Sequence, residues 1–118
     1  MPASIPDAKH LLKVVIKYLE QELMPTLEGY HRFQTRVSAN VLSTVRRELE
    51  LGQKQAAEER ARLRAILGHD GEVEDLSREL ADRIRAGTIS IEDRAVHEHV
   101  RESLAEALRI NNPKWLTR

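Results

Sequence analysis

The most informative stretch of this chain is Gly29–Gly52, which reads GYHRFQTRVSANVLSTVRRELELG. Its large apolar side chains recur every three or four residues, the spacing that places them along one side of an α-helix. They are Tyr30, Phe33, Val37, Val41, Val45 and Leu49. We therefore predict one long helix, with this apolar stripe turned toward a core and with Gly52 ending it in the left-handed conformation.

The flanking segments repeat the three-and-four spacing, and each predicts a further helix. The predicted ranges are about 7–23, 54–67, 72–86 and 91–110. Pro25 has no amide hydrogen for an intrahelical bond, so we expect the first helix to break there rather than to continue with a kink. The last helix is expected to pack through Val96, Val100, Leu104, Ala107 and Leu108.

The ends of these segments carry residues with capping chemistry. Short polar side chains accept hydrogen bonds from free amides at a helix start, and glycine readily turns left-handed after a helix end. The expected caps are Ser4 or Asp7, Thr26, Asp70 and Ser90 at helix starts and Gly52, Gly68 and Gly87 at helix ends. The sequence thus predicts an all-α fold: a compact single-domain bundle of about five helices over residues 1–118, with the second helix central and a C-terminal tail at 111–118.

Composition excludes several classes of protein. Lys and Arg total 19 and Asp and Glu total 19, so the net charge is zero, whereas general nucleic-acid binding and polybasic membrane anchoring need excess positive charge. The absence of cysteine excludes disulfides, thiol catalysis and cysteine-bound zinc. No apolar run approaches the roughly 20 residues of a membrane span, and residues 1–6 lack signal-peptide features. We expect a cytoplasmic protein that binds neither nucleic acid nor membrane.

No pattern of residues predicts catalysis or metal binding. His97 and His99 are two residues apart, so a helix points them in different directions, whereas paired metal ligands on one helix stand four apart. The segment 69–71, His-Asp-Gly, resembles part of a phosphotransferase catalytic loop. The Gly-rich phosphate-binding element of such enzymes is missing, which favours a simple turn. The sequence therefore predicts no catalytic residue, no metal and no cofactor.

A row of polar residues also follows the second predicted helix, roughly opposite the apolar stripe. It consists of Arg36, Asn40, Ser43 and Arg47. The row is either an ordinary solvated face or a contact strip for a partner or an anion, because arginine forms paired hydrogen bonds with carboxylate or phosphate. Trp115, in the polar tail, either folds back on the bundle or docks into another chain.

Three polar residues, His31, Gln34 and Ser38, interrupt the apolar stripe or lie at its edge. If they are buried, each needs a hydrogen-bond partner or costs about 1–3 kcal/mol. They form either a satisfied buried cluster that fixes the register of the helix or a polar patch in a candidate ligand pocket.

Six segments carry a resemblance to a known family. They are 27–29 (LEG), 36–42 (RVSANVL), 47–52 (RELELG), 67–71 (LGHDG), 83–87 (RIRAG) and 112–115 (NPKW). In this order, and over nearly the whole chain, they resemble a bacterial family of small proteins classed as a domain of unknown function. Ser38 and Trp115 stand where the family pattern leads us to expect alanine and tyrosine.

Members of that family are typically encoded beside an aminoglycoside-phosphotransferase-like kinase and an acyl-CoA dehydrogenase. The chain is also similar to the small subunit of the levulinate-pathway hydroxyacyl-CoA kinase. The resemblance implies a non-catalytic accessory subunit that binds the larger kinase subunit, and the polar row with Trp115 is the expected contact surface. The alternatives are a homodimeric helical structural protein and a small-ligand-binding protein without a kinase partner.

Overall fold

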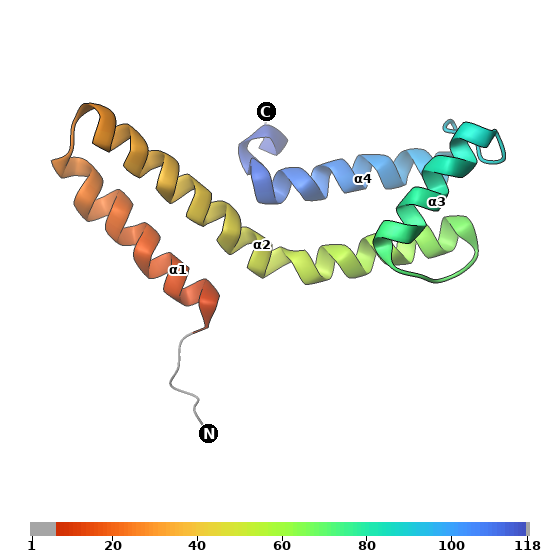
Figure 1. Cartoon of the computed structure of the whole chain (residues 1–118), viewed down its shortest axis with the longest axis horizontal. Helices are drawn as coiled ribbons and strands as arrows, with labels where there is room; N and C mark the ends of the chain where they lie inside the picture. Colours follow the sequence, from red (N-terminus) through yellow and green to blue (C-terminus); the bar gives the residue numbers. More distant parts are fainter. Residues whose placement is uncertain (1–6, 118) are drawn as a thin grey trace, which may run out of the picture. The chain divides into compact units, whose positions relative to one another are not determined.

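The computed structural model describes residues 7–117. These residues form four α-helices joined by short turns, with no strand among them (Figure 1). The α-helices are α1 (Ala8–Lys17), α2 (Gly29–Leu67), α3 (Val73–Ala86) and α4 (Arg94–Asn111). The shorter elements are a π-helical turn, η1 (Tyr18–Leu23), and two 3₁₀ turns, η2 (Met24–Thr26) and η3 (Pro113–Thr117). The predicted all-α fold is confirmed. None of these helices is both long and apolar enough to cross a membrane.

Helix α2 continues through Gly52, so the predicted helix end at that residue is wrong and the second and third predicted helices are one. Positive φ angles occur instead at Gly29, Gly68 and Gly87. A glycine inside a helix costs about 1 kcal/mol relative to alanine. The neighbours of Gly52 are mostly strong helix formers, namely Arg, Glu and Leu before it and Gln, Lys and Ala after it. Their summed propensity carries the hydrogen-bond ladder across the glycine.

Several predicted caps are confirmed. The Asp7 carboxylate accepts a hydrogen bond from the His10 amide at 2.9 Å, which caps α1, and the other candidate, Ser4, lies outside the described residues. Gly87 is left-handed at the end of α3, with φ 80°, and Gly68 is left-handed just after α2, with φ 84°. The predicted break at Pro25 is also confirmed, because that residue lies in η2 between α1 and α2.

Three other caps differ from the prediction because each side chain has a nearer partner. The Thr26 hydroxyl donates backward to the Leu23 carbonyl at 2.7 Å and closes the preceding turn. Asp93, not Ser90, caps α4, since its carboxylate accepts from two amides in the first turn. Asp70 does not cap α3, which begins after Glu72 without a side-chain cap.

The structure falls into two compact units that divide between Leu51 and Gly52. In the first unit, α1 runs antiparallel beside the N-terminal part of α2 (Figure 1). The second unit contains the C-terminal part of α2 with α3, α4 and η3. A single folding domain over residues 1–118 stays a prediction.

The first unit buries few apolar side chains. Ile16 on α1 and Ala39 on α2 are buried, and the Lys13 ammonium lies 3.7 Å from the Glu50 carboxylate, which links the two helices. Because the side chain of Ala39 is small, the face that carries it allows a close approach of α1. Helix α2 turns about 100° per residue, so Val37 and Val41, two positions from Ala39, lie on roughly the opposite side.

The apolar stripe predicted to face a core is therefore exposed in this structure. Its members range from 40% exposed at Val37 to 70% exposed at Tyr30. The spacing correctly identified a continuous apolar side of α2, but the buried residue of α2 in the first unit, Ala39, lies on roughly the opposite side. Helix α1 likewise has exposed apolar residues on its outer side: Leu11, Val14, Val15 and Tyr18. The first unit thus presents apolar surface on both helices.

The second unit contains the hydrophobic core. Its buried members come from three helices: Leu63 and Leu67 of α2, Leu76 and Leu80 of α3, and Val96 of α4. Partly buried side chains packed against them are Ile66, Val73, Ile84 and Ile89. Val96 faces inward on α4 as predicted, but Val100 and Leu104 are exposed. The buried side of α4 continues instead through His99, Glu106 and Ile110.

Candidate functional site

The first candidate is the α2 stripe, by which we mean the exposed side chains Tyr30, Phe33, Val37, Val41, Val45 and Leu49. All six belong to one helix within the first unit. Tyr30 also makes an edge contact with the His31 ring, at a centroid separation of 5.3 Å. Single exposed apolar residues are ordinary, whereas a row of them along one helix is typical of a surface that binds another molecule. The α2 stripe is therefore a candidate docking surface.

The predicted polar row lies on the same helix, and its side chains become less exposed toward the C-terminal end of the row. Arg36 and Asn40 are exposed, whereas Ser43 and Arg47 are partly buried. The Arg47 guanidinium donates to the Thr44 hydroxyl at 3.3 Å. The remaining predicted contact residue, Trp115, lies in η3 of the second unit and is 59% exposed. A role for these residues in binding a partner stays a prediction.

His31, Gln34 and Ser38 are exposed. The first alternative, a satisfied buried cluster, is therefore wrong, because the stripe itself is exposed. Their hydrogen-bonding groups can be satisfied by solvent, so they carry no burial cost. Whether they contact a ligand stays a prediction.

The loop that follows α2 is held by ion pairs rather than by caps. The Arg60 guanidinium forms two hydrogen bonds with the Asp70 carboxylate, at 2.9 and 3.0 Å. The pKa of Asp70 is lowered to about 2, mainly because its carboxylate accepts these hydrogen bonds from Arg60. The Glu79 carboxylate accepts from the His69 ring at 2.8 Å and raises the pKa of that histidine. These contacts anchor His69 and Asp70 as parts of a turn.

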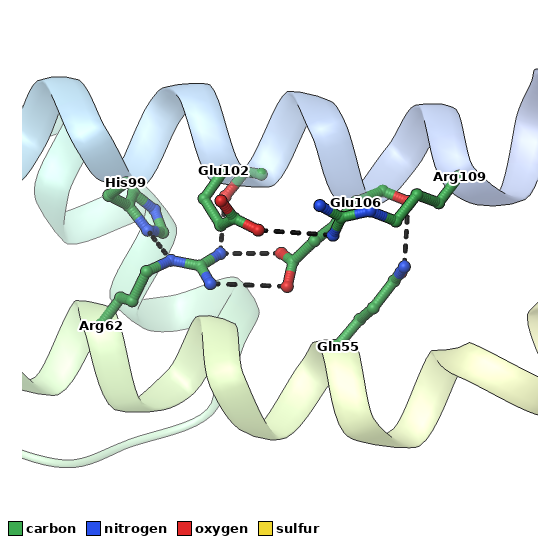
Figure 2. Close-up of polar contacts among 7 residues, drawn as sticks. Gln55, Arg62, His99, Glu102, Glu106 and Arg109 are labelled. Carbon is green, nitrogen blue, oxygen red and sulfur yellow. Dashed lines mark hydrogen bonds and ion pairs between the residues drawn. The ribbon is translucent and has the colours of Figure 1, made fainter. Parts of the chain in front are cut away.

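The second candidate is an ion-pair network in the second unit, centred on Arg62 of α2 (Figure 2). Its guanidinium donates to the Glu106 carboxylate at 2.8 and 3.4 Å. It also donates to the His99 ring at 3.1 Å and to the Ser103 hydroxyl at 3.2 Å. The Gln55 amide donates to the backbone carbonyl of Glu106 at 3.0 Å. These contacts join α2 to α4 through polar atoms.

Burial makes this network energetically important. The side chain of Glu106 is only 4% exposed and that of Arg62 is 22% exposed. A carboxylate removed from water in this way is stable only with a close cation and several hydrogen bonds, which Arg62 supplies. Glu102 and Arg109 form a neighbouring pair at 3.3 Å that remains half exposed (Figure 2).

The sequence analysis did not identify this network, although a signal existed. Val96, His99, Ser103, Glu106 and Ile110 follow each other at spacings of three and four along α4. A helix side that is apolar at both ends and polar in its middle indicates a buried polar cluster with a partner on another helix. Which of the many arginines supplies the partner requires the packing of α2 against α4.

The environment of His99 favours the neutral form of its ring. Burial is the main cause that lowers its pKa below the ordinary value of 6.5, and the positive charge of Arg62 lowers it further. The carboxylates of Glu59 and Glu106 act weakly in the opposite direction. Since Nδ1 accepts a hydrogen bond from Arg62, a neutral ring must carry its own hydrogen on Nε2.

We predict that acidification destabilises the second unit through His99. Between its lowered folded pKa and 6.5, the unfolded chain binds a proton that the folded chain does not. The free energy of unfolding therefore falls as the pH falls through this window. Urea unfolding followed by Trp115 fluorescence, at several pH values between about 5 and 7, measures the slope.

His69 requires a comparison of variants, because its raised pKa contributes stability below 6.5 that is lost at higher pH. His99→Gln is expected to remove the acid-sensitive part of the slope. His97→Gln, at an exposed position of the same helix, is the matched control and should leave the slope unchanged. Equal slopes for His99→Gln and the unmodified chain would contradict the assignment.

Among the residues that the structure describes, no group of three His, Cys, Asp or Glu side chains is placed to hold a metal ion.

One comparison with known proteins found a relationship. The family model DUF6285, a domain of unknown function, matches residues 25–115. The match includes α2, α3, α4 and Trp115, while α1 lies outside it. Neither the curated proteins nor the solved structures contain a match to this chain. Because the family model covers most of the sequence, the chain belongs to the DUF6285 family of domains of unknown function.

Proposed function

We propose that this protein is a non-catalytic accessory subunit that binds a larger, aminoglycoside-phosphotransferase-like kinase acting on hydroxyacyl-CoA. The observation that carries the binding role is the exposed α2 stripe. The identity of the partner rests on the sequence resemblance to the small subunit of the levulinate-pathway kinase. A subunit of this kind works by contact, and the stripe offers apolar surface for it.

Burial of the stripe by a partner is energetically favourable. Complete burial of a valine or phenylalanine side chain releases roughly 1.5–3 kcal/mol, so covering a half-exposed one releases about half of that. Association must offset the loss of translational and rotational freedom, which is several kcal/mol or more. A row of six such side chains therefore supplies much of the driving force that a stable complex needs.

Two members of the polar row border the α2 stripe, because Arg36 stands three residues after Phe33 and Asn40 three residues after Val37. Arg36 and Asn40 are exposed on α2, and polar side chains around an apolar patch are the usual rim of a protein interface. Arg36 can pair with a carboxylate of the partner, which would set the orientation of the complex more than its strength.

The proposal is tested by co-expression with the aminoglycoside-phosphotransferase-like kinase that we expect to be encoded beside the gene for this chain. The unmodified chain is expected to co-purify with the tagged kinase, and Val41→Asp is expected to abolish co-purification by placing a charge in the stripe. Val41 is already exposed, so the variant should keep the circular dichroism spectrum and melting temperature of the unmodified chain. Gln53→Asp, at an exposed polar position of α2 outside the stripe, is the matched control and should still co-purify.

Two results would contradict the proposal. One is a kinase that has full activity alone and never retains this chain. The other is Val41→Asp retaining the kinase as well as the unmodified chain does. Sedimentation of the isolated protein distinguishes self-association, because a second copy on the stripe would make the unmodified chain a dimer and Val41→Asp a monomer.

A further inference from the structure

The second unit also contains an open groove, separate from the α2 stripe. Its apolar wall comes from two helices, with Leu80, Ala81 and Ile84 of α3 and Val100 and Leu104 of α4. Its polar members are Glu59, Ser77, His99 and Ser103. The groove has a volume of about 340 Å³, near the lower end of the range for small-molecule sites. Leu104 is 62% exposed at its edge, so apolar surface there remains open to a ligand.

A buried hydrogen-bond donor faces this groove. His99 is only 7% exposed, and its ring lines the groove. Nδ1 is occupied by Arg62, which leaves the hydrogen on Nε2. Within residues 7–117, Nε2 has no hydrogen-bond partner. Every fully buried polar side-chain atom in that range does have a partner, so Nε2 is not fully buried. Nε2 must therefore reach solvent-accessible space, and the groove is the space that its ring borders.

Ser103 supplies a second donor one helical turn further along α4. Its oxygen accepts a hydrogen bond from Arg62 at 3.2 Å, so its hydroxyl hydrogen remains available to another acceptor. His99 and Ser103 are four residues apart and therefore lie on the same side of the helix. Since the same guanidinium holds both side chains, their positions are fixed before any ligand binds.

We propose that this groove binds a small neutral molecule with an apolar body and one acceptor oxygen, such as the carbonyl of a ketone, ester or amide. The apolar wall contacts the body of the ligand, and the His99 Nε2–H and the Ser103 hydroxyl donate hydrogen bonds to its oxygen. The charge nearby argues against an anion, because Glu106 already neutralises Arg62 and Glu59 adds a further negative charge at the groove. The groove shares no residue with the α2 stripe, and this proposal does not rest on the kinase contact.

The test uses 2-heptanone as the probe, with heptanoate as its charged counterpart. Histidine-labelled and uniformly ¹⁵N-labelled protein is titrated while proton–nitrogen correlation spectra are recorded. We expect saturable shifts of the His99 Nε2–H signal and of amides lining the groove. Heptanoate is expected to bind at least about tenfold more weakly, which corresponds to roughly 1.4 kcal/mol.

Two variants show where the probe binds. Ala81→Phe fills the groove from an exposed position of α3 and should weaken 2-heptanone binding at least about tenfold. Ala61→Phe, at an exposed position of α2 outside the groove, is the control and should bind normally. Circular dichroism spectra like that of the unmodified chain are expected for both variants and check that they fold. Absence of saturable shifts at the groove, equal binding of heptanoate, or unchanged binding by Ala81→Phe would each overturn the proposal.

Discussion

Glu106→Ala is expected to lower the free energy of unfolding by about 3 kcal/mol, the lower end of the range for breaking a buried ion pair. The substitution leaves the guanidinium of Arg62, only 22% exposed, without its carboxylate. Arg62 retains His99 and Ser103 as acceptors, but both are neutral. Hydrogen bonds to neutral groups do not replace the lost charge pair. Urea unfolding followed by Trp115 fluorescence and by far-ultraviolet circular dichroism measures the change.

Two further variants separate charge burial from a general loss of contacts. Glu102→Ala removes the half-exposed partner of Arg109 on the same helix, and we expect it to cost less than about 1 kcal/mol. The double substitution Arg62→Met with Glu106→Leu removes both charges and should recover most of the stability lost by Glu106→Ala. A double variant as unstable as Glu106→Ala would show that the packing of Glu106, rather than its charge, holds α4.

Residue spacing predicted the helical fold correctly, but it did not predict which side of each helix is buried. The pattern of Tyr30 to Leu49 does mark one side of a helix, and that side is apolar. The spacing along one helix does not determine which neighbour covers that side, because the covering depends on where the other helices are placed. In this chain Ala39, a weak hydrophobic signal, lies buried while the stronger stripe is exposed. A surface that binds another molecule produces the same pattern as a core.

Helix ends were predictable where backbone geometry alone determines them. Gly68 and Gly87 adopt the left-handed conformation, and Pro25 breaks the helix that precedes it. Gly52 has the same chemistry but continues as helix, because the residues around it favour helix strongly. The caps at Asp70 and Ser90 failed because neighbouring side chains competed, with Arg60 binding Asp70 and Asp93 capping α4.

The sequence of α4 indicates a buried polar cluster, but it does not identify the residues of other helices that complete the network. Arg62 binds residues that lie 37 and 44 positions further along the chain, His99 and Glu106. Contacts at such separations depend on the α3 segment returning the chain, so they follow from tertiary packing. The hydrogen on Nε2 of His99 follows only when Arg62 is placed beside Nδ1.

Leu63→Ala is expected to be among the most destabilising substitutions in the chain, at about 3–4 kcal/mol. Leu63 is fully buried in the second-unit core, in one cluster with Leu67, Leu76, Leu80 and Val96. Removing its branched end loses transfer free energy and leaves a cavity that rigid helices fill only in part. The measurement is the urea midpoint at an unchanged slope against denaturant concentration, followed by Trp115 fluorescence.

The matched substitution is Val41→Ala in the exposed stripe. If the stripe were a core, as its spacing alone suggests, this change would cost about 1–3 kcal/mol. In the present structure Val41 is exposed, so little burial is lost and the better helix propensity of alanine offsets the loss. We expect a change within about 0.5 kcal/mol in the isolated chain. A large loss for Val41→Ala, equal to that for Leu63→Ala, would mean that the stripe is covered within the protein itself and is not available to a partner.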